Sequence, residues 1–391
     1  MTLRLSPVSC WFVVFAALLL SVQVTAAQVF DLPIEGDIVA YTTAQADAIY
    51  LYDTATDITR TLQFGSGDHH VWDFSPDGCR VLFTLTNGND PTRLYSANLN
   101  GDDMRLLLAT DELGAGPWFI WEPDWNPTEN RVAFTISRET EQGRESRVAW
   151  VEPGNVPQVP NFYSVAGDEH TPRWSPDGNW LAYVSYEERA AGATIYATAE
   201  PNTEDTAPRV READIWMVSA DGLTKERITR FDVGSAASPR WSPDGELLGF
   251  VYSPIPGENQ FWMIAAVAEA IPTPLSFEWN QTLDVVWHPD GKTMVASVRG
   301  FHGVSTARLW TIPIVGNADT DATRFFEAAE FNNLVVDYPR FNATGTHLAF
   351  RSNYSVSVLE LATGELFALE GAGNMPPVWS PAGFIGESAC N

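Results

Sequence analysis

The feature that most constrains the fold of this chain is a short motif that recurs along it, an aromatic residue followed by a tight turn. Seven copies begin at Phe74 (FSPDG), Trp125 (WNPTE), Trp174 (WSPDG), Trp241 (WSPDG), Trp287 (WHPDG), Phe341 (FNATG) and Trp379 (WSPAG). They stand 38 to 67 residues apart and average about 51. A period of this size indicates a repeat architecture in which each repeat is one supersecondary unit.

Each copy is typical of a hairpin turn between two strands. In Ser-Pro-Asp-Gly, Pro presets φ at the second turn position, Asp bonds its own backbone, and Gly accepts a positive φ. Apolar residues follow at alternate positions, as in Val81 and Phe83 or Leu181 and Tyr183, which indicates a strand with a buried face. The position between them is often small: Ala133, Ala182, Gly249 and Ala349. Small residues there allow one sheet to pack closely on the next.

Two further short strands follow in each unit, for example at residues 215–218 and 227–229. Four short strands per repeated unit are the signature of a β-propeller. We therefore predict an all-β protein, a single β-propeller with seven four-stranded blades. Six or eight blades stay open as alternatives because the fourth unit is longer than the others.

The two ends of the repeat region complement each other. The N-terminal unit begins near Asp37 and contains the last three strands of a blade, without an aromatic-turn strand before them. Residues 377–380 supply such a strand with no blade after it. We predict that this C-terminal strand joins the N-terminal blade and closes the ring, which removes the exposed sheet edges of a linear array.

The repeated W-S-P-D-G, with the aliphatic strand after it, resembles the TolB-type propeller repeat (WD40-like) of exported bacterial proteins over roughly residues 37–384. The resemblance implies the propeller fold. It leaves function open, because such repeats occur in transport-associated scaffolds, sugar lyases and the propeller halves of peptidases. TolB itself has six blades and a separate N-terminal domain, for which this chain has no room. We expect a stand-alone propeller rather than a TolB equivalent.

The N-terminus predicts export. Arg4 provides a basic end, residues 11–20 are apolar, and Ala26-Ala27 offers a cleavage site before Gln28. We predict a signal peptide at residues 1–27, a propeller domain at 28–391, and a periplasmic or extracellular location. An uncleaved anchor is the alternative, but the apolar run is shorter than the ~20 residues that span a bilayer. No membrane insertion is expected after cleavage.

The charge of the chain limits its partners. The formal net charge is -27, and Lys225 and Lys292 are the only lysines. Nucleic acid is excluded as a partner class because phosphates need Lys and Arg as counter-charges. We expect a protein or carbohydrate partner and a monomeric chain.

Two cysteines remain after the predicted cleavage. Cys79 directly follows the turn of the second blade, and Cys390 lies a few residues after the final turn. Ring closure would bring both to the same end of adjacent blades, and export permits a disulfide. The sequence leaves open whether they form this bond or stay as thiols.

Loop lengths favour one end of the propeller as the binding face. The longest connections all fall at the end opposite the Ser-Pro-Asp-Gly turns: residues 137–147, 186–214, 253–260 and 299–307. Loops of such length on a rigid scaffold usually carry function. In the interblade stretch 110–121, Trp118 and Trp121 are candidates to stack on a sugar or anchor a protein. Packing between blades is the alternative.

Histidines form a second candidate site on that face. His70 and His170 each stand four residues before the aromatic of their repeat. Further candidates on the same face are Asp168, Glu169 and His302. Converging imidazoles could hold a divalent metal, whereas solvated loop residues are the plainer interpretation. No other cofactor is predicted.

Two functions fit these observations. The first is an exported, non-catalytic binding or scaffold propeller that recognises a protein or glycan on its long-loop face. The alternative is a metal-assisted polysaccharide lyase, similar to oligogalacturonate lyase, acting at the channel mouth. Nothing in the sequence identifies an enzyme, so no catalytic residue is assigned.

Overall fold

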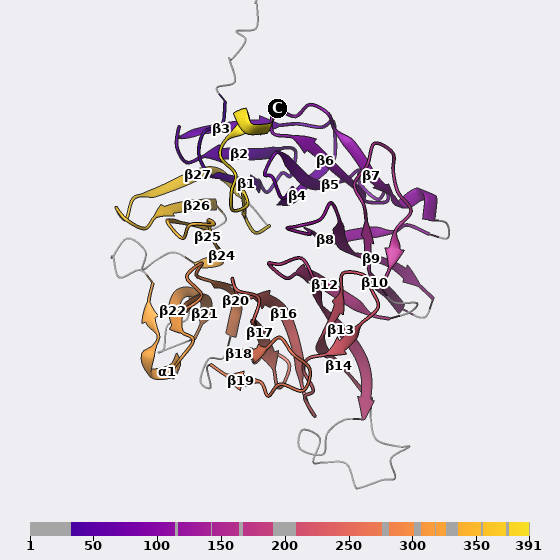
Figure 1. Ribbon diagram of the computed structural model, residues 1–391, viewed down its shortest axis with the longest axis vertical. Helices are drawn as coiled ribbons and strands as arrows, with labels where there is room; N and C mark the ends of the chain where they lie inside the picture. Colours follow the sequence, from indigo (N-terminus) through magenta and orange to yellow (C-terminus); the bar gives the residue numbers. More distant parts are fainter. Residues whose placement is uncertain are drawn as a thin grey trace, which may run out of the picture. The chain divides into compact units, whose positions relative to one another are not determined.

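The computed structural model describes residues 33–113, 116–141, 143–163, 167–190, 209–275, 281–300, 306–316, 318–325, 335–352, 355–372 and 375–390. The predicted signal peptide, residues 1–27, lies outside them. Seven four-stranded antiparallel sheets stand around a common centre (Figure 1). The prediction of an all-β, seven-bladed propeller is therefore confirmed. Within the described ranges, no helix has the length and apolar character needed to cross a membrane.

The blades follow one another in chain order, each built from its innermost strand outward. Their strands are β28 (Val378–Trp379), β1 (Ile38–Thr42), β2 (Ile49–Asp53) and β3 (Ile58–Leu62) in blade 1; β4 (Asp68–Phe74), β5 (Arg80–Thr86), β6 (Arg93–Asn98) and β7 (Arg105–Ala109) in blade 2; β8 (Phe119–Trp125), β9 (Val132–Thr140), β10 (Gly143–Val151) and β11 (Asn161–Phe162) in blade 3; β12 (Glu169–Trp174), β13 (Trp180–Ala190), β14 (Arg209–Ser219) and β15 (Lys225–Arg227) in blade 4; β16 (Ser235–Trp241), β17 (Leu247–Ser253), β18 (Gln260–Ala265) and β19 (Thr273–Pro274) in blade 5; β20 (Gln281–Trp287), β21 (Thr293–Arg299), β22 (Arg308–Pro313) and β23 (Thr323–Arg324) in blade 6; and β24 (Val336–Phe341), β25 (His347–Ser352), β26 (Ser355–Glu360) and β27 (Leu366–Ala372) in blade 7.

The Ser-Pro-Asp-Gly motif forms the turn between the first two strands of a blade. The Ser75 hydroxyl donates to Asp77 Oδ1, at 2.5 Å, and the same oxygen accepts the Cys79 N–H at 3.0 Å. Gly78 has a φ of 73°, a conformation that an L side chain would strain. Ser175 with Asp177 and Ser242 with Asp244 repeat the hydroxyl bond. The motif therefore fixes where each blade turns.

Small residues bring neighbouring blades together, as the sequence predicts. Ala133, Ala182 and Ala349 are fully buried. At Gly249 in β17, an added Cβ would lie 2.7 Å from Met294 Cε of the next blade. The position between the two large apolar side chains of this strand therefore accepts only the hydrogen of Gly or the methyl group of Ala. Neighbouring sheets can then pack face to face.

The aromatic residue of the motif also ties blades together. In some blades the indole N–H of the motif's Trp donates to a backbone carbonyl of the preceding blade. Trp241 donates to Arg173 at 2.9 Å, and Trp287 donates to Arg240 at 3.0 Å. Trp379 donates in the same way to Arg340, at 2.7 Å. These bonds run around the inside of the ring, next to the central channel.

The C-terminal segment closes the ring. Strand β28 pairs antiparallel with β1, which confirms the predicted closure. Past β28, Glu387 accepts hydrogen bonds from the Arg60 guanidinium at 2.9 and 3.0 Å. A disulfide joins Cys79 to Cys390 across a sequence separation of 311. The end of the chain is thus fastened to both blade 1 and blade 2.

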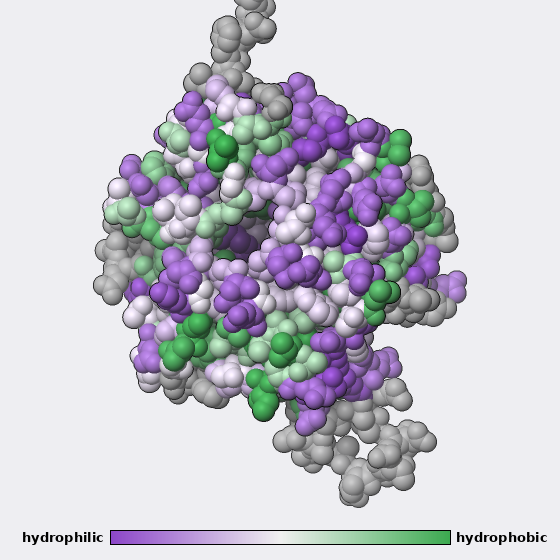
Figure 2. All heavy atoms as spheres, in the orientation of Figure 1, coloured by the Kyte–Doolittle hydropathy of each residue, from purple (hydrophilic) through white to green (hydrophobic). Residues whose placement is uncertain are grey.

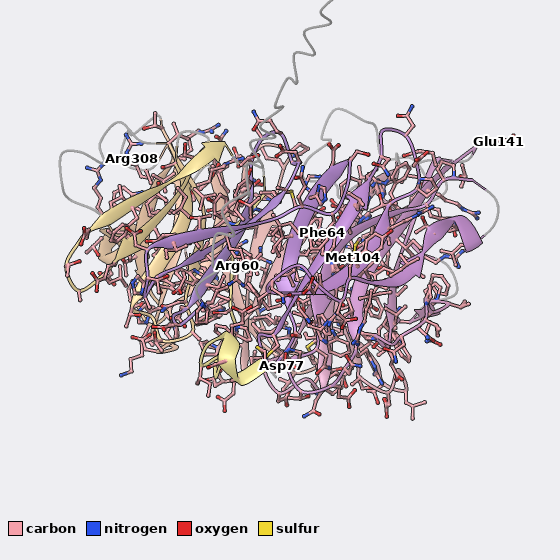
Figure 3. All side chains as sticks on the ribbon, turned by 90° about the horizontal axis from the view of Figure 1, so that it is seen from above. Arg60, Phe64, Asp77, Met104, Glu141 and Arg308 are labelled. Carbon is pink, nitrogen blue, oxygen red and sulfur yellow. A yellow bond between two sulfur atoms is a disulfide. The ribbon has the colours of Figure 1, made fainter. Side chains whose placement is uncertain are left out.

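The two ends of the propeller differ. Asp77, in a motif turn, lies at one end, and Glu141 and Arg308 lie at the other (Figure 3). Two connections predicted as long loops begin and end as paired strand: β9 and β10 pair up to Thr140 and Gly143, and β13 and β14 pair up to Ala190 and Arg209. Residues 191–208 lie outside the described ranges. The prediction of a loop was wrong for residues 137–147 and for the described ends of 186–214, because polar residues there continue the strand ladder.

Candidate binding site in the central channel

The innermost strands surround a cavity of about 940 Å³. A hollow at the centre of the ring marks it in Figure 2. Strands β4, β8, β12, β16, β20 and β24 contribute to its wall, and residues 375–382 complete it. The closing C-terminal segment therefore forms one side of the channel.

A repeated backbone bulge aims side chains into this cavity. In four blades, the residue before the Pro of the innermost strand has a positive φ: Glu122 at 52°, Thr171 at 55°, Ser238 at 55° and Tyr338 at 51°. The strand register shifts at each of these points. Pro cannot donate to the ladder, and a bulge accommodates it. Such a backbone costs about 1–3 kcal/mol per residue, so the surrounding structure must hold it in place.

Charged residues form a belt around the channel. In five blades, the residue directly before the motif's aromatic is charged and lines the cavity: Asp73, Asp124, Arg173, Arg240 and Arg340. Asp284 of β20 adds a further carboxylate. We call these six residues the channel belt.

The two acidic members at blades 2 and 3 link neighbouring blades. Asp73 Oδ2 accepts the backbone N–H of Trp125 at 2.7 Å, and Asp124 Oδ2 accepts that of Trp174 at 2.7 Å. Enclosure by protein raises the pKa of both carboxyls, and the charge of Asp124 raises the pKa of Asp73 further. Asp73 therefore holds its proton to a higher pH than an ordinary aspartate.

The other side of the belt is a locked ion triad. Asp284 accepts from Arg340 at 2.6 Å and from Arg240 at 3.3 Å. Burial opposes ionisation of Asp284, but the charges of Arg340 and Arg240 outweigh it and lower its pKa. Burial lowers the pKa of Arg240 to about 10, so its guanidinium stays charged at neutral pH. The triad places two guanidinium groups on one carboxylate and keeps one net positive charge.

Blades 3 and 4 present a different group of side chains to the channel. Trp121, Arg144, His170 and Arg173 all line the cavity, and we call them the blade 3–4 cluster. Trp121 is 42% exposed. Arg144 belongs to the extended β9–β10 hairpin, and Trp121 and His170 stand near the starts of β8 and β12. The cluster therefore faces the long-loop end of the channel.

The predicted site residues divide between the channel and the interior. Trp118 is 6% exposed and belongs to a hydrophobic core cluster, with the Arg138 guanidinium 4.4 Å from its ring centre. Glu169 is 2% exposed, accepts the Val148 N–H and pairs with Lys225 at 3.2 Å. Packing accounts for both positions, and neither reaches a ligand in the channel. Of the two tryptophans, Trp121 is the accessible one.

The histidines do not assemble a metal site within the part of the chain that the structure describes. His170 lines the cavity, whereas His70 is absent from its lining and burial lowers its pKa. His302 lies outside the described residues. Among those that are described, no group of three or more His, Cys, Asp or Glu side chains could hold a metal ion.

His170, Asp168 and Ser146 contact one another without the geometry of a catalytic triad. His170 Nε2 lies 2.8 Å from Asp168 Oδ1 and 3.2 Å from Ser146 Oγ. A triad needs the acid and the serine on opposite ring nitrogens. Ser146 is also fully buried. These contacts hold the His170 ring in place, and burial lowers its pKa, so it faces the channel mainly as a neutral imidazole.

The channel belt was missed in the sequence analysis, although the signal is present there. The repeated motif begins at the aromatic and continues into the second strand, so the residue immediately before the aromatic lies outside the pattern that predicts the fold. That position reads Asp, Asp, Arg, Arg, Val, Arg and Val along the chain. Five charges at one position of a buried repeat indicate a polar channel.

Comparisons with known proteins bear on the family. No family model matches the chain. Over 117 residues it is 31% identical to a TolB homolog of Chlorobium chlorochromatii, a match that covers 25% of this chain and 26% of that protein. The WSPDG repeat and the closed ring of four-stranded blades agree with this match. The chain carries a TolB-type β-propeller.

This TolB-type propeller also resembles solved structures of enzymes. It superimposes on a puromycin hydrolase with a TM-score of 0.58 at 14% identity, over 88% of this chain and 53% of that one. It superimposes on an oligogalacturonate lyase of Vibrio parahaemolyticus with a TM-score of 0.53 at 12% identity, over 84% and 92%. At such identities the likeness shows the fold alone. The matched stretches span less than half the length of the curated relatives.

Proposed function

We propose that this protein is an exported, non-catalytic binding propeller that holds a protein or glycan partner at the long-loop end of its channel. The exposed Trp121 ring at the edge of a preformed polar cavity carries this proposal. Aromatic rings with one polar end are favoured where a site is partly apolar and partly wet. Cavities with a few convergent polar groups are typical ligand sites.

A metal-assisted polysaccharide lyase is the second candidate, and its supporting observation is His170 in the cavity wall. Metal analysis of the mature protein and of the variants His70→Ala and His170→Ala separates the two functions. A stoichiometric metal that both variants lose, together with lost cleavage of an acidic polysaccharide, would favour the lyase. Unchanged metal content and no cleavage would favour the binding propeller.

The binding proposal is tested with a photo-crosslinking residue. p-Benzoylphenylalanine replaces Trp121, or replaces Phe162 as a control on the outer strand β11. The control is matched, because the two side chains are 42% and 41% exposed. The protein is expressed with its full N-terminus in the host that exports it, irradiated, and isolated from the exported fraction.

We expect a discrete adduct from position 121 and none from position 162. Protease and glycosidase digestion of the adduct identifies the partner as protein or glycan. Equal labelling at both positions, or none at position 121, would refute the channel as the binding site. A mature N-terminus at Gln28 in the exported fraction would support the predicted signal peptide.

A further inference from the structure

The channel is far less acidic than the protein as a whole. The net charge of the chain is -27, yet four arginines line this one cavity: Arg144, Arg173, Arg240 and Arg340. Four carboxyl groups line it as well: Asp73, Glu122, Asp124 and Asp284. Enclosure raises the pKa of Asp73 to about 8, which weakens its negative charge near neutral pH. The arginines keep their charge, so the cavity wall carries a surplus of cations.

The arginine that lacks a carboxylate partner lies on the side of blades 3 and 4. Arg240 and Arg340 share Asp284 and are committed to the ion triad. Arg173 comes no closer than 3.9 Å to the carboxylate oxygens of Glu122 and Asp124. Among the described residues, Arg144 forms no ion pair and donates to the Ser137 hydroxyl at 3.2 Å. Arg144 is therefore the arginine of the channel without a carboxylate partner among the described residues, and it belongs to the blade 3–4 cluster.

An aromatic face is fixed beside these guanidinium groups. The Trp121 indole N–H also donates to Ser137 Oγ, at 3.2 Å. Trp121 and Arg144 thus meet at one hydroxyl, which holds the ring and the guanidinium side by side. His170 adds a mainly neutral imidazole that Asp168 and Ser146 hold in place. A ligand here meets a cation and a ring at once.

We propose that the blade 3–4 cluster binds a ligand in which a carboxylate stands next to a ring. The fork of N–H donors in a guanidinium matches the two oxygens of a carboxylate. Arg173 already faces Glu122, so Arg144 is the guanidinium left to pair with a ligand, and one guanidinium matches one singly charged carboxylate. The inference rests on the proposed binding function and names the chemistry of the ligand. A uronic acid sugar and the C-terminus of an aromatic-ended peptide both supply it.

The test is titration calorimetry on the mature full-length protein with pairs that differ in charge alone. Phenylacetate and phenylacetamide test the carboxylate itself. Trigalacturonate and its methyl ester, and Gly-Gly-Phe and its C-terminal amide, distinguish the two sources. We expect each acid that binds to do so at least about tenfold more tightly than its neutral partner, because a charge-assisted pair is lost in the latter.

Arg144→Gln is the decisive variant, since glutamine keeps a donor for Ser137 and the residue lies outside the belt. Arg105→Gln on the outer strand β7 is its control, because Arg105 pairs with Asp103 far from the channel wall. We expect Arg144→Gln to weaken binding of the acids about tenfold or more and to leave the neutral partners unchanged. Arg173→Gln should add to this loss, and circular dichroism establishes that each variant is folded.

Three results would overturn the inference. These are equal affinity for acid and neutral partner, undiminished acid binding in folded Arg144→Gln, and no heat from any acid up to about 10 mM, the weak limit of useful affinity. If one of these results is found and crosslinking at position 121 persists, the proposed binding function is retained and only the preference for carboxylates is refuted. Loss of that crosslinking would instead refute the proposed function.

Discussion

Removing the disulfide should lower the stability of the propeller substantially. The variant Cys79→Ser/Cys390→Ser opens a loop closed across a sequence separation of 311. The pairing of β28 with β1 and the ion pair between Arg60 and Glu387 still hold the native ring. The effect of the bond therefore falls mainly on the unfolded chain, which it makes more compact.

The size of the effect follows from the length of the loop. The chain-entropy relation gives about 19 cal/mol/K for a loop of this length, or about 5.7 kcal/mol at 25 °C. Residual structure in the unfolded chain reduces this value, and native disulfides typically contribute about 2–5 kcal/mol. We expect the double variant to lose about 3–5 kcal/mol of unfolding free energy.

Urea unfolding followed by tryptophan fluorescence measures the difference between the oxidised protein and the variant. Intact mass before and after reduction and alkylation shows whether the bond is formed in the sample. The transition of the variant should move to clearly lower urea, with a steeper dependence because its unfolded chain exposes more surface. Coinciding transitions in a sample whose mass proves the bond would refute the entropic argument. Two alkylated thiols without prior reduction would refute the bond itself.

Three further predictions concern the blades and the belt, each measured by urea unfolding. Trp287→Phe should cost about 1 kcal/mol more than Trp174→Phe, because both indoles are buried but that of Trp174 has no hydrogen-bond partner among the described residues; equal costs would contradict this. Gly249→Val should cost about 1–3 kcal/mol by overpacking against Met294, and Gly249→Ala less; a neutral Gly249→Val would contradict the close packing. Asp73→Asn should gain stability relative to the wild type as pH rises from about 4 towards neutrality, because the raised pKa of Asp73 makes the folded state bind more protons than the unfolded state in that window; a pH-independent difference would contradict the shift.

The fold could be predicted from the sequence because the repeat encodes it locally in every blade. The turn motif, the alternating apolar residues and the small residue between them each specify one feature, and all appear in most copies. The three-stranded unit at the N-terminal end and the single extra strand at the C-terminal end then imply closure, which the pairing of β28 with β1 confirms. These features depend on near neighbours in the chain, so no long-range information is needed.

The site was harder to predict because the bulge breaks the alternation of the innermost strand. Register shifts between Trp121 and Asp124 and between His170 and Arg173, so a period of two cannot say which side chains face the channel. Residues adjacent in the sequence can therefore lie in different environments: Glu169 is buried against blade 3, whereas His170 lines the cavity. The depth of Trp118 in the core likewise depends on Arg138 and the neighbouring blade, which a single sequence does not place.

The same bulge also separates the residues that make the fold from those that make the site. The aromatic, the turn and the small residue are nearly constant around the ring, whereas the position four before the aromatic is Trp121 in blade 3, His170 in blade 4, Ala237 in blade 5 and Asp337 in blade 7. The backbone that carries these side chains has the same positive φ three residues before the aromatic in all four blades. A change of side chain there alters the channel without altering the turn or the blade interface. Trp121 and His170 of the blade 3–4 cluster are therefore side chains that the fold does not require, which is the physical reason for proposing that they serve a ligand rather than stability.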